Sequence, residues 1–134
     1  MRNFELSKNM LTMGGQFYPT GHIVAMFADE KAARNAGRTL SDGGVADEEI
    51  CLITPEVMLR DIVRTVGSAD STLPSPGTEA DTVRRYADYA SKGHYALLIH
   101  APHGEDAERV MALLKDQMPA FAERYRMLVI EDLA

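Results

Sequence analysis

The chain has 134 residues, of which 46% are hydrophobic and 25% are charged, a composition that fits one globular domain and excludes a disordered chain. Its formal net charge of −6 disfavours a nucleic-acid binder, which needs a basic surface, and disfavours binding to anionic membranes. Because the sequence shows neither a secretory leader nor an apolar run of about 20 residues, we expect a cytoplasmic protein whose partners are neither nucleic acid nor membrane.

Residues 1–20 are predicted to form an arm rather than a regular element. Glycines 14–15 and Pro19 interrupt the segment, which favours turns. Its apolar side chains are too numerous for a solvated tail; they are Met10, Leu11, Met13, Phe17 and Tyr18. We therefore expect the arm to dock on its own domain or on a neighbouring chain.

Two stretches of the chain repeat one pattern, a short apolar strand that leads into a helix. The first begins with residues 21–27 (GHIVAMF) and the second with residues 93–99 (GHYALLI). Asp29 is the predicted N-cap of the first helix, because its carboxylate accepts free amide protons. Each unit is followed by another strand, so that strands are expected at residues 22–27, 49–54, 94–100 and 125–130. Two such β-α-β units predict an α+β fold, a ferredoxin-like split βαβ sandwich with a four-stranded antiparallel sheet.

About forty residues between the second and third predicted strands are additional to the minimal ferredoxin-like fold. Residues 54–56 (TPE) supply, in this order, an N-cap, a first-turn proline and a first-turn acid. This succession predicts a helix start. A second helix is predicted to begin at Thr78, after a loop over residues 67–77 rich in serine, proline and glycine. We expect residues 55–92 to be a helical insert, between strands 2 and 3, within a single domain that spans residues 1–134.

The predicted strands are apolar on both faces, whereas a sheet covered on one face alternates apolar and polar residues. In the first strand Val24 and Met26 oppose Ile23, Ala25 and Phe27, yet both sets are apolar. The second face is therefore covered either by the insert with the arm or by the same face of another subunit. Burial of each such side chain is worth ~1.5–3 kcal/mol, so we expect a homodimer through the sheet face.

Three histidines and two carboxylates are predicted to approach one rim of the sheet. In the ferredoxin-like order the first and third strands are antiparallel neighbours, so His22 lies near His100, with His103 just beyond. The fourth strand brings Glu131 and Asp132 to the same rim. Imidazoles with carboxylates bind divalent metals or perform acid–base chemistry. No H-x-x-H or H-E-x-x-H spacing is present, however, which favours rim histidines that only make hydrogen bonds.

The helix that begins at Thr78 offers a second candidate site. Its free amides attract anions, and Arg84 and Arg85 add positive charge. Glu79 and Asp81 already occupy that positive helix end, which favours a capped helix with solvated arginines. Both arginines remain candidate ligand-binding residues.

The sequence carries no motif for nucleophilic catalysis or for nucleotide binding. Cys51, the single cysteine, lies in an apolar strand, where a thiol behaves as a small hydrophobe. The patterns G-x-S-x-G, G-x-G-x-x-G and the P-loop are absent. We therefore predict no catalytic residue, no bound metal and no cofactor.

The residues that carry a family resemblance are spread over most of the chain from about residue 21. They are the strand 23–27 leading into the helix at Asp29, the strand 49–54 (EICLIT), and residues 77–86, 92–94 and 128–133. With this order of elements, the chain resembles the small bacterial general-stress-protein-like domains of ferredoxin fold. The resemblance implies that fold and a link to a bacterial stress response, and it supplies no catalytic residue.

These observations predict a non-enzymatic, dimeric module of unknown molecular function that binds a small ligand or regulates another process. The first alternative is a metal-dependent or acid/base enzyme of the dimeric α/β-barrel type that uses the rim histidines. The second is a structural protein that pairs with another chain through its sheet.

Overall fold

A computed structural model describes residues 1–12, 15–65, 78–126 and 130–133, and these residues form one six-stranded sheet with helices on both faces. The elements are β1 (Arg2–Asn3), η1 (Lys8–Met10), β2 (His22–Phe27), α1 (Glu30–Asp42), η2 (Asp47–Glu49), β3 (Ile50–Ile53), α2 (Pro55–Val57), η3 (Met58–Ile62), α4 (Thr78–Ser91), β4 (Tyr95–His100), α5 (Gly104–Leu114), η4 (Lys115–Gln117), β5 (Phe121–Tyr125) and β6 (Ile130–Asp132). Here η3 is a π-helical stretch, and the other η elements are 3₁₀ turns.

The strands run in the order β1-β3-β4-β2-β5-β6 across the sheet. The central four pair antiparallel, and the two segments of the sequence repeat, β2 and β4, are direct neighbours in register from His22 opposite His100 to Phe27 opposite Tyr95. The prediction of an α+β fold is confirmed. The prediction of a four-stranded, wholly antiparallel sheet is wrong, because the sheet is mixed: β1 adds parallel to β3 at one edge, and β6 adds antiparallel to β5 at the other.

The last predicted strand, residues 125–130, is replaced by a hairpin. The structure has β5 over Phe121–Tyr125 and β6 over Ile130–Asp132, and residues 127–129 lie outside the described part of the chain. The sequence obscures β5 because Glu123 lies on the same face as its two aromatic ends. A charged residue at an inward position breaks the apolar alternation from which a strand is predicted.

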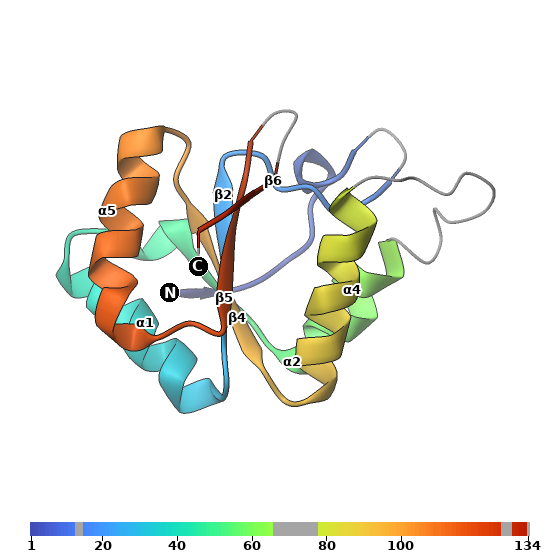
Figure 1. The fold of residues 1–134 in the computed structure, drawn as a ribbon, viewed down its shortest axis with the longest axis horizontal. Helices are drawn as coiled ribbons and strands as arrows, with labels where there is room; N and C mark the ends of the chain where they lie inside the picture. Colours follow the sequence, from blue (N-terminus) through green and yellow to red (C-terminus); the bar gives the residue numbers. More distant parts are fainter. Residues whose placement is uncertain (13–14, 66–77, 127–129, 134) are drawn as a thin grey trace.

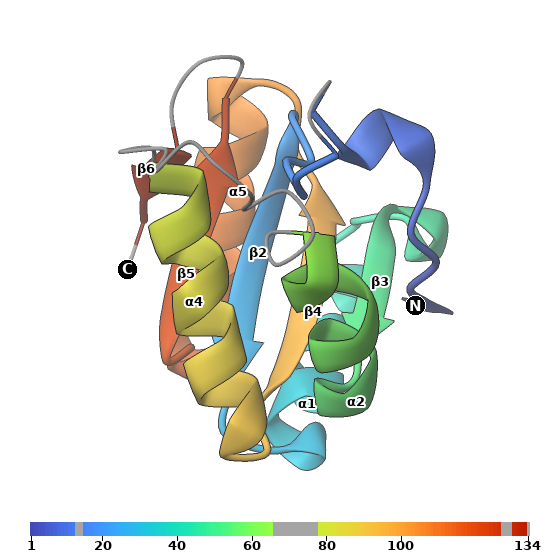
Figure 2. The same cartoon turned by 90° about the vertical axis from the view of Figure 1, so that its right-hand side faces the viewer.

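The sheet divides the core into two layers (Figure 1). Helices α1 and α5 cover one face, where Ala33, Ala36 and Leu40 pack with Ile23 and Leu97. Small alanines let α1 lie close to the strands. The helical insert, made of α2, η3 and α4, covers the other face together with the N-terminal arm, as Figure 2 shows.

The arm docks on its own domain, which is the first of the two alternatives that the sequence left open. Phe4, Phe17 and Tyr18 are buried in the layer under the insert, and the Phe17 N–H donates to Oγ1 of Thr65 at 2.9 Å. Arm and insert together pack the second face of the sheet. The homodimer through this face stays a prediction. The reason for expecting it is an uncovered apolar face, and in the described residues the arm and the insert cover that face.

The predicted helix starts are confirmed. The Ala32 N–H donates to Asp29 Oδ1 at 2.8 Å, and the Val57 N–H donates to Thr54 Oγ1 at 3.2 Å with Pro55 in the first turn. Helix α4 begins at Thr78, and the predicted loop 67–77 lies outside the described residues. No helix in the described ranges is long and apolar enough to cross a membrane.

Candidate functional site: a histidine rim

The pairing of β2 with β4 brings His22 and His100 together, as the sequence predicts. Their ring centroids lie 5.0 Å apart. Burial lowers the pKa of His22, and His100 lowers it further, so the His22 imidazole is neutral at pH 7. Its Nδ1 lies 3.1 Å from the carbonyl oxygen of Thr20, which only accepts, so Nδ1 carries the proton. Nε2 of His22 is left as an acceptor.

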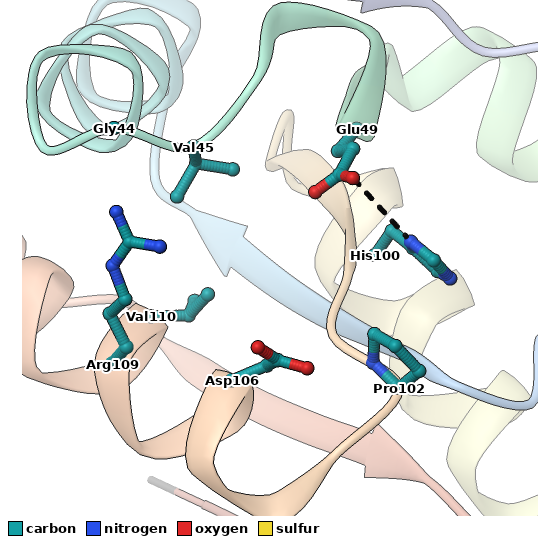
Figure 3. A pocket seen from close by; sticks show the side chains of 8 residues that line it. All are labelled: Gly44, Val45, Glu49, His100, Pro102, Asp106, Arg109 and Val110. Atoms are coloured by element: carbon teal, nitrogen blue, oxygen red, sulfur yellow. Dashed lines mark ion pairs between the residues drawn. The ribbon is translucent and has the colours of Figure 1, made fainter.

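Glu49 joins this rim from η2, the 3₁₀ turn that leads into β3. Its Oε1 lies 3.9 Å from Nδ1 of His100 (Figure 3). Both side chains are nearly half exposed, at 45% and 44%, so water weakens the attraction between them. The pair is a loose contact that another polar molecule can replace.

Two hollows flank the Glu49–His100 pair, and we call them the rim hollows. The first has a volume of about 160 Å³ and is lined by Gly44, Val45, Glu49, His100, Pro102, Asp106, Arg109 and Val110 (Figure 3). The second has a volume of about 220 Å³ and is lined by Arg2, Met10, His22, Glu48, Glu49, Cys51, Leu98 and His100. Each is smaller than the ~300–1,000 Å³ of a site for a drug-sized ligand, so a rim hollow suits only a small molecule.

Each rim hollow carries charges of both signs. In the first, Arg109 donates from Nη2 to the Gly43 carbonyl oxygen at 2.6 Å, opposite the Asp106 and Glu49 carboxylates. In the second, Arg2 Nη2 lies 3.7 Å from Cys51 Sγ, and Glu48 stands nearby in the lining. Cations and anions in one small space offer both donors and acceptors to a polar ligand.

His103 and Glu131 are not brought to the paired histidines. His103 is exposed at the N-cap of α5, where its backbone N–H donates to Asp106 Oδ2 at 3.1 Å. Glu131 lies on β6, where its Oε1 is 3.6 Å from Nη1 of Arg124 across the hairpin. Neither side chain lines a rim hollow in the described part of the chain.

The arginines predicted as an anion site are engaged by the chain's own carboxylates. Arg84 is exposed and pairs with Asp81 at 2.7 Å. Arg85 Nη1 lies 2.9 Å from Glu123 Oε1 and 3.7 Å from Asp132 Oδ1. With its charge already compensated by two carboxylates, Arg85 is poorly suited to hold a free anion.

Glu123 is the most deeply buried carboxylate among the described residues, with only 2% of it exposed. Burial, and then the neighbouring Asp132, raise the pKa of the Glu123 carboxyl to about 7, while Arg85 opposes the rise. Glu123 lies in a cleft of about 170 Å³, which we call the carboxyl cleft; its lining is Asp81, Thr82, Arg85, Glu123, Ile130 and Asp132.

Sequence reasoning missed Glu49, Arg2 and Arg109 at the rim, and Glu123 in the carboxyl cleft. No spacing in the sequence links the three rim residues, since each reaches the site from a different element. Glu123 had one usable signal, its position two residues from aromatic neighbours on either side along a strand. Among the described residues, no group of three or more His, Cys, Asp or Glu side chains is placed to hold a metal ion.

Comparisons of the chain with protein-family models, with curated proteins and with solved structures find no match.

Proposed function

We propose that this chain is a non-enzymatic binding or regulatory module that takes a small polar ligand in the rim hollows. The observation that carries the proposal is that both hollows open on the same Glu49–His100 pair. A ligand at that pair contacts both cavities. The carboxylate and the imidazole supply an acceptor and a titratable group, and neutral His22 supplies a second acceptor.

The proposed ligand is a small neutral or zwitterionic molecule rather than an anion. The first rim hollow sets Arg109 against Asp106 and Glu49, and the second sets Arg2 against Glu48 and the same Glu49. A purely anionic ligand meets repulsion from the acids, whereas a molecule with both an amine and an acidic or carbonyl group satisfies both signs. The volumes limit such a ligand to the size of an amino acid or a nucleobase.

Regulation follows from where the two hollows lie. The second is lined by Arg2 and Met10 of the arm, and the first by Asp106 and Arg109 of α5. A ligand at the Glu49–His100 pair, which both hollows share, contacts the arm on one face of the sheet and a helix on the other. Binding then stabilises the docked arm by mass action, because the undocked chain lacks half of the site.

The fold proposal that accompanies this function is a ferredoxin-like sandwich with additions. The central order β3-β4-β2-β5, with α1 and α5 on one face, supports it, and β1, β6 and the insert are the additions. A link to a bacterial stress response and a homodimer remain part of the proposal. A light-scattering mass of two chains at micromolar concentration supports the dimer, and a mass of one chain counts against it.

An acid/base enzyme at the same rim is the second candidate, and the neutral state of the His22 imidazole favours it. A neutral imidazole with an available Nε2, beside a second imidazole and a carboxylate, has the composition of a general-base site. Turnover of a bound compound distinguishes the two functions, because a binding module returns its ligand unchanged.

The test is a screen by NMR in which imidazole resonances report binding. The probes are the α-amino acids and the free nucleobases, each added at millimolar concentration to the wild-type protein, and small dicarboxylates serve as the anionic control that should bind more weakly. We expect at least one to shift the ring signals of His22 and His100 while leaving those of exposed His103 unchanged. His100→Gln should weaken that binding at least ~10-fold, about 1.4 kcal/mol, and the matched control His103→Gln should not. If all probes leave His22 and His100 unmoved, the proposal is wrong for these ligand classes.

A further inference from the structure

Two carboxyl groups face each other across the C-terminal hairpin. Glu123 of β5 and Asp132 of β6 are register partners, so their side chains project from the same face of the sheet. Like charges in such a position destabilise a strand pair. Arg85 of α4 reaches both, at 2.9 Å and 3.7 Å, and its guanidinium lies 4.5 Å from the centroid of the Phe121 ring. One fixed cation therefore serves two carboxylates.

No second cation completes the cluster in the described residues around it. The titratable or charged groups that face Glu123 are, by element, Arg85, Asp81 and Tyr86 from α4, Asp132 from β6, and Tyr125 from β5, whereas its β2 partner is the apolar Val24. Asp81 pairs with Arg84, and the Tyr86 hydroxyl lies 2.8 Å from that of Tyr125. A proton on the buried Glu123 carboxyl removes the excess negative charge.

We propose that Glu123 and Asp132 share a proton that fastens β6 to β5, and that β6 loosens as the pH rises from acidic values to neutrality and this proton is lost. With the proton present, the carboxyl group of Glu123 donates a hydrogen bond to the carboxylate of its register partner Asp132. Without it, two negative charges repel across the hairpin and Arg85 compensates only one. The pair acts as a pH-sensitive latch on the edge of the sheet.

The titration range and the size of β6 both favour such a latch. The raised pKa of Glu123, about 7, places the loss of the proton near neutral pH. Strand β6 has three residues, and past it the Leu133 N–H donates to the Ala122 carbonyl oxygen at 2.9 Å. So short an edge strand opens at lower cost than the central sheet. Opening uncovers the backbone groups of β5.

The expected size of the effect follows from proton linkage. If opening returns Glu123 to its ordinary pKa of 4.5, the opening equilibrium rises about tenfold per pH unit from there to pH 7 and then levels off. The total rise has an upper limit of about 300-fold, the ratio of the two acid constants. None of the residues involved lines a rim hollow, so the latch stands or falls independently of the ligand site.

The experiment measures hydrogen exchange of the full chain by NMR between pH 5 and pH 8.5. Protection factors, corrected for the intrinsic rise of exchange with pH, are compared for the Leu133 amide and for the amides of β2 and β4. We expect protection at Leu133 to fall by up to about tenfold per pH unit between pH 5 and pH 7 and to level off above pH 7, and the central amides to fall less. In Glu123→Gln, which cannot ionise, the Leu133 profile should be flat.

Two further variants keep the test decisive if Glu123→Gln folds poorly. Asp132→Asn changes a side chain that is 72% exposed. It should lower the pKa of the Glu123 carboxyl and raise the protection of the Leu133 amide at pH 8. Glu131→Gln is the matched control, because Glu131 is next to Asp132 on β6 but pairs with Arg124 of β5. This change should leave the pH dependence of Leu133 protection unchanged. The latch is refuted if Asp132→Asn keeps the wild-type profile, or if the carbon resonance of the Glu123 carboxyl titrates near pH 4.5.

Discussion

Replacement of Phe17 by alanine tests whether the arm is part of the folded core. The ring is fully buried, and it packs edge-on against Phe4 and Tyr125 with centroids 6.2 Å and 6.0 Å away. Truncation of a buried phenylalanine costs about 3–5 kcal/mol, and each aromatic pair accounts for about 0.5–1.5 kcal/mol of such a loss. We therefore expect Phe17→Ala to lower the free energy of unfolding by about 4 kcal/mol.

Urea unfolding followed by circular dichroism measures this loss. Leu59→Ala is the control, since Leu59 is 41% exposed on the insert and its truncation should cost less than about 1 kcal/mol. A free energy of unfolding that depends less steeply on urea concentration in Phe17→Ala would show that the arm is already undocked in the native state. If Phe17→Ala costs less than Leu59→Ala with the urea dependence unchanged, Phe17 is not packed as described and the arm does not cover the second face.

Three other changes give distinct expected outcomes. Met118, which is 83% exposed, has a φ of 50°, so Met118→Gly should stabilise the chain by about 0.5–1 kcal/mol while Met118→Ala, which keeps a Cβ, should give no gain in thermal unfolding. Asp29→Ala removes the N-cap acceptor of α1 and should cost about 1 kcal/mol in urea unfolding; no loss would contradict the cap. Because the pKa of Glu123 is raised from 4.5 to about 7, the stability it contributes is full below pH 4.5 and is lost as the pH rises through 7. Between pH 5 and pH 8 the wild type should lose about 2–3 kcal/mol more of its free energy of unfolding than Glu123→Gln, and parallel pH profiles of the two proteins would refute the shift.

The sequence was most informative where local chemistry decides the structure. Asp29 and Thr54 mark helix starts because a cap involves only a few adjacent residues. The matched apolar segments that contain His22 and His100 fall on neighbouring strands because their pattern is that of buried strands. The helix starts follow from short-range patterns alone. The pairing of the two strands follows from a short-range pattern together with the assumed ferredoxin-like strand order.

Long-range pairings account for what sequence reasoning missed. Strand β1 forms because Arg2 and Asn3 meet β3, some fifty residues away, and no local signal marks two exposed residues as a strand. Glu123 looks like an ordinary surface acid until Arg85 and Asp132 are placed beside it. In the rim hollows, too, Glu49 and Arg109 meet only after the chain has folded.

A crystal structure of the protein with the tightest-binding compound from the NMR screen tests the central claim most directly. The account predicts electron density for that compound between Glu49 and His100, with contacts into at least one rim hollow and with the 3.9 Å Glu49–His100 contact altered. Density for the compound at another surface, with both rim hollows empty, would contradict it.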